Sequence, residues 1–269
     1  QEVEAALLTS WAGVAFPEWR DDLHVTEQEP VAHARWFGGL DWGYSGPGAF
    51  VLGAADGERV TIRFDHKFHE VRPYDLGYTL AHRFRDRRLR IPEWIVYDSA
   101  MDVLGPTVIE EFREGMEAVL QEHAPPCVPA VKGRGSRVQG KVLLHSYLAY
   151  ETDEAGNVLP WKYPRLRVHK ECTYLLKTLP ALPRDEKNPE DVDTHADDHG
   201  YDALRYALMA REPHVEVREP DVPRDIHPGF LPSGKRRSRD RSPEKVAEEE
   251  MLEMLQQGLP VGGRYGVRR

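Results

Sequence analysis

The sequence feature that most limits the possible folds is a change of hydrophobic period near residue 73. Before it, three apolar or alternating segments, residues 36–42, 49–55 and 59–64, are separated by short turns. This spacing predicts an antiparallel meander of three strands. After it, some segments have the period of a helix and others are short apolar runs. We therefore expect an α/β fold, with a mixed β-sheet flanked by helices.

The second part of the chain is predicted to alternate helices with strands. The helices are expected at residues 74–89, 107–116, 140–150, 172–179 and 200–211, and the strands at 94–98, 128–131 and 165–168. The segment 94–98 is short and almost continuously apolar, which is typical of a parallel strand covered on both faces. The parallel strands should extend the sheet that the meander begins.

Three regions of different character divide the chain. Residues 1–34 mix turn-forming and extended pieces, and we expect a lead-in there rather than a packed domain. Because the chain begins with Gln1 rather than Met, we also expect it to be part of a longer polypeptide. Residues 35–212 carry the periodic segments and are predicted to form one domain. Prolines and charged runs fill residues 213–269, which predicts a flexible tail.

Composition excludes several classes of protein. The 36 Lys and Arg against 45 Asp and Glu give a net charge of −9, which argues against a surface that coats nucleic acid as a whole. A local basic site remains compatible with that charge. No apolar run approaches the roughly 20 residues that span a bilayer, so we expect no membrane partner. Two distant cysteines exclude a disulfide scaffold and a cysteine-rich zinc module.

Acidic residues fall at positions where their carboxylates could meet. Asp41 and Asp98 each end a predicted apolar strand, where a buried carboxylate needs a partner. Asp198, His199 and Asp202 begin the last helix with spacings of three and four, so they share one face. If the two strands are neighbours, Asp202 could lie opposite Asp41 and Asp98. Converging carboxylates raise each other's pKa, and divalent cations such as Mg²⁺ or Mn²⁺ relieve that repulsion.

Each of these acids also has an ordinary structural explanation. Asp98 could begin a turn, and Asp198 could cap the final helix. For any one residue alone, the structural explanation is the simpler one. The three strand-end and helix acids together favour a metal site.

A basic, glycine-rich loop is the second candidate for function. Residues 131–137 read Val-Lys-Gly-Arg-Gly-Ser-Arg and lie between a predicted strand and a predicted helix. Backbone amides and the cations of Lys132, Arg134 and Arg137 could contact phosphate groups there. A solvated loop with no ligand is the alternative, and the residues alone do not favour either explanation.

Three segments together resemble the nuclease domain of the large terminase subunit, the DNA-packaging motor of tailed bacteriophages. They are residues 39–45 (Gly-Leu-Asp-Trp-Gly-Tyr-Ser), 96–100 (Val-Tyr-Asp-Ser-Ala) and 198–208 (Asp-His-Gly-Tyr-Asp-Ala-Leu-Arg-Tyr-Ala-Leu). The last is the most specific of the three. Residues 14–19 also resemble the segment that joins the terminase ATPase to its nuclease, and the whole resemblance covers roughly residues 14–212.

The resemblance implies an RNase H-like fold and a set of site residues. Asp41, Asp98 and Asp202 would be the catalytic, metal-binding acids, with His199 and Asp198 close to the metals. The substrate would be concatemeric double-stranded viral DNA in the cytoplasm of the host cell. The portal protein, the small terminase subunit and other copies of the large subunit would be partners. The same resemblance favours DNA contact for the 131–137 loop.

A mechanism follows if the acids converge. Two divalent cations, Mg²⁺ or Mn²⁺, would share Asp41, activate a water and stabilise the leaving oxygen, so the chain would be an endodeoxyribonuclease with little sequence preference. No G-x-x-x-x-G-K-[ST] motif occurs, so we expect no ATP hydrolysis in this chain.

Two other functions remain open from the residues. A junction resolvase or integrase shares the acid layout on the same fold, and it would prefer branched DNA. A packaging module that binds DNA or portal without cutting would show no metal-dependent cleavage.

Overall fold

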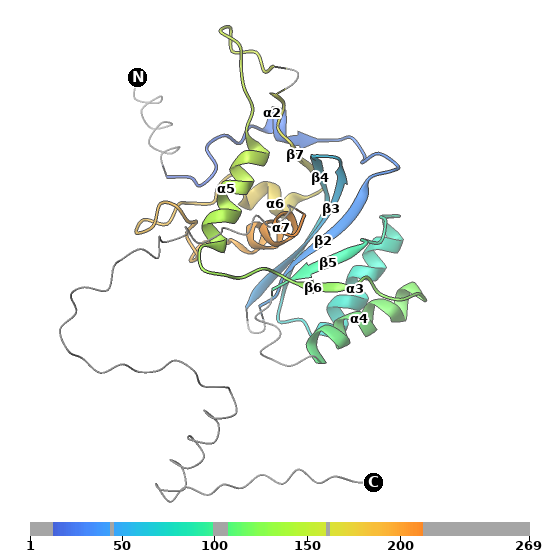
Figure 1. Cartoon of the computed structure of the whole chain (residues 1–269). Coiled ribbons are helices and arrows are strands. Elements are labelled where there is room, and N and C mark those ends of the chain that lie inside the picture. The colour runs from blue at the N-terminus through green and yellow to red at the C-terminus, as the bar shows by residue number, and fades with distance from the viewer. Residues whose placement is uncertain (1–12, 44–45, 99–106, 160–161, 212–269) are drawn as a thin grey trace, which may run out of the picture. The chain divides into compact units, whose positions relative to one another are not determined.

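The computed structural model describes residues 13–43, 46–98, 107–159 and 162–211. Within them the chain forms a seven-stranded mixed sheet in the order β1-β7-β4-β3-β2-β5-β6, with helices on both faces (Figure 1). The predicted α/β class is thereby confirmed. Parts of the segments 39–45 and 96–100, and the whole predicted tail 213–269, lie outside the described residues.

The predicted meander forms the centre of the sheet. Strands β2, β3 and β4 are antiparallel neighbours, whereas β5 pairs in parallel with β2, β6 with β5, and β7 with both β4 and β1. The strands are β1 (Val25–Thr26), β2 (Arg35–Asp41), β3 (Pro47–Asp56), β4 (Arg59–His69), β5 (Trp94–Tyr97), β6 (Cys127–Pro129) and β7 (Leu166–His169).

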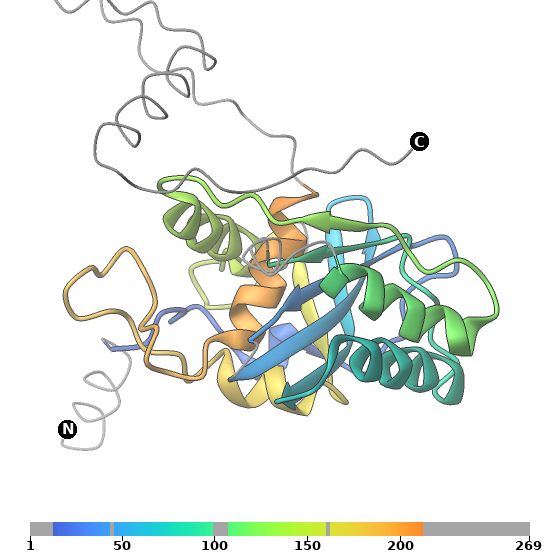
Figure 2. The ribbon, with the colours of Figure 1, turned by 90° about the horizontal axis from the view of Figure 1, so that it is seen from below.

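Two helical layers cover the sheet, as Figures 1 and 2 show. Helices α3 and α4 pack on one face around Phe84 and Phe112, while α5, α6 and α7 pack on the other around Leu144, Leu175 and Leu204. The helices are α2 (Asp21–His24), α3 (Pro73–Asp86), α4 (Thr107–Leu120), α5 (Ser136–Leu148), α6 (Thr173–Thr178) and α7 (His199–Met209). Among the described residues, no helix has the length and apolar character that crossing a bilayer requires.

The structure differs from the expected lead-in at residues 13–34. Ala15 and Phe16 are almost fully buried in the core on the α7 side, and the Ala15 N–H donates to the Leu182 carbonyl at 2.7 Å. The ring of Phe16 lies 5.6 Å from that of Tyr201 on α7. Strand β1 then adds to the sheet edge beside β7. A strand of two residues is too short to show a periodic pattern in the sequence. It forms here because β7, which is distant in sequence, pairs with it.

Helix α7 approaches the sheet most closely at a glycine. A Cβ placed on Gly39 of β2 would lie 2.1 Å from the Ala203 carbonyl oxygen and 2.9 Å from the Ala207 Cβ. The missing side chain therefore lets the helix rest directly on β2, two residues before that strand ends at Asp41. This contact fixes the start of α7 above the end of β2.

Replacing Gly39 tests this close packing. We expect Gly39→Ala to lower the free energy of unfolding by about 2–3 kcal/mol, because backbone of α7 must move to admit the methyl group. Denaturant unfolding with Gly46→Ala as the matched control measures it, since a Cβ there meets nothing within 4 Å. Equal stability of the two variants would contradict the close approach.

A buried carboxylate on β4 holds the start of α6. Asp65 Oδ2 accepts a hydrogen bond from the Leu175 N–H at 2.7 Å. Burial raises the pKa of Asp65 to about 6, although the backbone donors of α6 oppose that shift. The folded protein therefore binds a proton at Asp65 that the unfolded chain has lost above about pH 4.

This shift predicts a pH dependence. The contribution of Asp65 to stability should fall as the pH rises from about 4 to 6, because ionisation costs more in the folded state. Asp65→Asn removes the ionisation and keeps an acceptor oxygen, so its stability relative to the parent should rise by about 2 kcal/mol across that window. Urea unfolding at pH 4 and pH 7.5 measures the difference. An unchanged difference would show that Asp65 titrates normally.

Candidate functional site

Two acids lie side by side at one end of the central strands. Asp41 is the last residue of β2, and Asp98 follows β5 directly. The Asp98 N–H donates to the Leu40 carbonyl at 3.0 Å, which continues the parallel register of these strands. Because side chains alternate along a strand, Asp41 and Asp98 both point to the face covered by α7. Both residues are buried.

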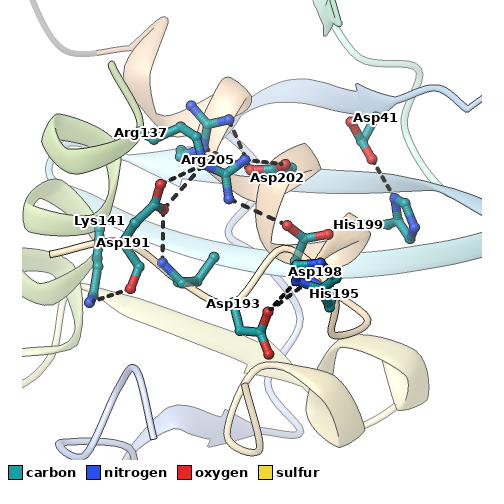
Figure 3. A network of polar contacts seen from close by, with 11 residues as sticks. Asp41, Arg137, Lys141, Asp191, Asp193, His195, Asp198, His199, Asp202 and Arg205 are labelled. Carbon is teal, nitrogen blue, oxygen red and sulfur yellow. Dashed lines mark hydrogen bonds and ion pairs between the residues drawn. The ribbon is translucent and has the colours of Figure 1, made fainter. Parts of the chain in front are cut away.

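The start of helix α7 brings two more acids to the same place. Asp198 is the N-cap residue of α7, and the Asp202 N–H donates to the Asp198 carbonyl at 2.8 Å. Both residues are buried, and Figure 3 shows them on α7 in the same close-up as Asp41 and His199. The Nδ1 atom of His199, between them in sequence, lies 2.8 Å from Asp41 Oδ2. Residues remote in sequence are thus joined across the gap between α7 and β2.

The pKa shifts of these residues also indicate that several negative charges lie close together. Burial raises the pKa of Asp41; the His199 contact opposes this shift, while the negative charges of Asp202 and Asp98 add to it. Burial, together with the charge of Asp202, raises the pKa of Asp198 to about 6. The contact with Asp41 raises the pKa of His199, which favours an imidazolium ion beside that carboxylate. Asp41 and Asp198 therefore resist ionisation partly because the other acids are near.

Basic side chains lie between these acids. Arg205, almost fully buried on α7, places Nη2 2.8 Å from Asp202 Oδ1. Arg137 places its guanidinium 3.1 Å from Asp202 and 3.4 Å from Asp198. The ammonium of Lys132 contacts Asp98 directly. Within the described residues, no three Asp, Glu, His or Cys side chains are close enough together to hold one ion in this arrangement.

The basic loop 131–137 contacts the acidic side chains directly. Of the three cations predicted to contact phosphate, Lys132 and Arg137 reach the carboxylates, and Arg134 is exposed. The loop borders a hollow of about 460 Å³ lined by Lys132, Gly135, Ser136 and Tyr206, among others. The arrangement places positive charge and open space next to the acids.

Sequence reasoning missed the residues that fix Arg137. Asp191 accepts from Arg137 Nε at 2.9 Å, and the buried Lys141 ammonium donates to the Asp191 and Pro189 carbonyls. Asp191 lies in an irregular loop, where no periodicity marks it. Arg205 could have been found, because its spacing of three from Asp202 places both on one helix face.

Comparison with known proteins gives the fold but no close relative. No family model and no curated protein matches the sequence. The nuclease domain of the P22 large terminase superposes with a TM-score of 0.52 at 14% identity, covering 74% of this chain and 93% of that one. The fold is that of a large terminase nuclease domain. The RNase H-like architecture expected from the sequence is thereby confirmed.

A longer large terminase shows the same likeness. The protein, from a thermophilic bacteriophage, matches with a TM-score of 0.53 at 14% identity, covering 72% of this chain. This chain spans 43% of that protein's length. Identities this low carry the fold alone, so the function must be argued from the side chains.

The shared guanidinium suggests a test of the acid cluster. Arg137→Met should lower the free energy of unfolding by about 1–3 kcal/mol in EDTA, because Asp191, Asp198 and Asp202 lose a common cation. Arg35→Met, which breaks an exposed pair with Glu93, should change it by less than about 0.5 kcal/mol. Chemical denaturation of both variants measures this. Equal losses would mean that Arg137 neutralises nothing essential to the fold.

Proposed function

We propose that this chain is the nuclease domain of a phage large terminase, a divalent-cation-dependent endodeoxyribonuclease that cuts concatemeric viral double-stranded DNA. The observation that carries the proposal is the convergence of buried carboxylates from β2, β5 and α7 at one end of the sheet. The likeness to terminase nuclease domains supports the same function. Little sequence preference is expected.

The donor atoms suit hard divalent cations. Carboxylate oxygens are the ligands that Mg²⁺ and Mn²⁺ prefer. In the described arrangement Lys132 contacts Asp98 and Arg137 contacts Asp202, so Asp41, Asp98 and Asp202 would have to draw closer together to hold these ions. Burial, with the negative charges of Asp202 and Asp98 added, raises the pKa of Asp41, and a bound cation would favour its ionised form. His199 and Asp198 flank the three and would complete or orient the ligand set.

The bound ions and the side chains of the protein would contribute to hydrolysis in different ways. Two bound cations would acidify a coordinated water and neutralise charge on the scissile phosphate. The chain's own residues provide the frame for this reaction. His199 holds one oxygen of Asp41, and Arg205 fixes the rotamer of Asp202 from the buried side. No covalent enzyme intermediate is required.

DNA would approach over the 131–137 loop. Arg134 is exposed and Lys132 is partly so, which lets both reach backbone phosphates. Arg137 faces the acids and contacts Asp202. It would therefore position Asp202 as well as contact phosphate. Contacts of this type act on the DNA backbone and carry no sequence preference of their own.

The setting proposed is the packaging machinery in the host cytoplasm. Residues 13–34 pack into the core and the sheet, so they would belong to the nuclease together with residues 35–212. Residues 213–269 would be a tail. Portal protein, small terminase subunit and further large-subunit copies would be the partners.

Plasmid nicking tests the proposal. Asp41→Asn, Asp98→Asn and Asp202→Asn should each reduce Mn²⁺-dependent relaxation of supercoiled plasmid at least about 100-fold, because each removes a charged ligand. Asp193→Asn is the matched control. It changes a nearby acid that contacts His195, and it should retain activity.

Other outcomes separate the alternative functions. Circular dichroism must show that each variant is folded. Parent protein that cuts nothing with either metal would leave a non-catalytic DNA- or portal-binding module. A strong preference for four-way junctions over linear duplex would indicate a junction nuclease instead.

A further inference from the structure

The contact between Lys132 and Asp98 places a protein cation on one of the carboxylates proposed to bind metal. We infer that Lys132 alternates between two anions: the Asp98 carboxylate while no divalent cation is bound there, and a DNA phosphate once a cation has replaced it. The inference rests on the proposed function. It adds a link between metal binding and DNA binding that the acids alone do not contain.

The path of the chain explains how Lys132 reaches the acids. The Ala130 N–H donates to the Tyr97 carbonyl at 2.7 Å, so the segment after β6 still runs beside β5. Two residues later, Lys132 extends its ammonium to Asp98, 5.3 Å from the centre of the Tyr206 ring on α7. The lysine therefore closes the β6 side of the acid cluster.

Lys132 is also the cation in this cluster with the fewest restraints. Arg205 is 1% exposed, and Arg137 is held on its other side by Asp191. The Lys132 side chain is 35% exposed. Gly133 follows it, with open space where a Cβ would stand. A flexible four-carbon stem on a glycine-rich loop can swing outward, whereas the two guanidinium groups are fixed.

Electrostatic repulsion between the Lys132 ammonium and a bound divalent cation would determine whether Lys132 contacts Asp98 or a DNA phosphate. An ammonium and a divalent cation on the same carboxylate would repel each other strongly at a separation of a few ångströms in a partly buried site. Metal binding must therefore displace Lys132, and the displacement lowers the apparent metal affinity. The released ammonium lies at the mouth of the cluster, where the phosphates of bound DNA would arrive. By linkage, metal should then strengthen DNA binding, and DNA should strengthen metal binding.

The experiment compares metal binding in three variants without DNA, by titration calorimetry with Mn²⁺. Lys132→Met should bind Mn²⁺ about tenfold more tightly than the parent, because no ammonium has to leave. Lys132→Arg keeps the charge and should bind like the parent. Lys67→Met is the matched control, since Lys67 lies on the same face of the sheet but pairs with Asp197, which is not a proposed ligand. It should change the Mn²⁺ affinity less than twofold.

A second measurement tests whether Lys132 contacts a DNA phosphate once a divalent cation is bound. Ca²⁺, which also prefers oxygen ligands, should strengthen duplex binding several-fold more in the parent than in Lys132→Met. The slope of log affinity against log salt should steepen by about one phosphate contact when Ca²⁺ is added to the parent only. Intact DNA recovered on a gel establishes that binding alone was measured.

The results separate this inference from the proposed function. If the parent binds Mn²⁺ and Lys132→Met binds it equally, the displacement is overturned while the nuclease assignment stands. If Lys67→Met gains as much affinity as Lys132→Met, general charge is responsible and the specific contact is overturned. If the parent binds no divalent cation at all, both proposals fail together.

Discussion

The mutual repulsion of carboxylates buried at one end of the sheet is the constraint to which the surrounding elements respond. Asp41, Asp98, Asp198 and Asp202 are all buried, and burial together with the neighbouring negative charges raises the pKa of Asp41 and of Asp198. Compensating groups come from three elements: an imidazole and a guanidinium from α7, a guanidinium from α5, and an ammonium from the loop after β6. A fold selected for stability alone has no need of such an arrangement, since apolar residues of similar volume are cheaper to bury.

Much of this site could be predicted because it depends on short-range pattern. The turn at Asp56-Gly57 predicts the β3–β4 hairpin, and the apolar run 94–98 predicts a buried parallel strand. The pairing of β2 with β5 was only a condition of the predicted site, and the structure supplies it. Helical spacing placed Asp198 and Asp202 on one face. The sequence pattern did not show whether α7 covers that end of the sheet. The close contact of α7 with Gly39 places the helix there, and such a contact leaves no periodic pattern in the sequence.

Other features could not be predicted because distant residues create them. The direction of the Arg137 side chain depends on Asp191, which lies in a loop more than fifty residues away. Strand β1 exists because β7 offers it an edge. Helix α5 begins at Ser136 rather than at the predicted residue 140, and Gly140 within it leaves room for the Arg205 side chain. Local propensity gives the elements, and packing between them sets their ends and the directions of their side chains.

The burial of Phe16 has a mechanical consequence. Its ring packs on Tyr201, the residue before Asp202, and the neighbouring backbone is tied to Leu182. The same ring lies 5.1 Å from that of His145 on α5, so one side chain touches both of these helices. Packing at Phe16 therefore ties together the two helices that supply Arg137 and Asp202 to the acid cluster.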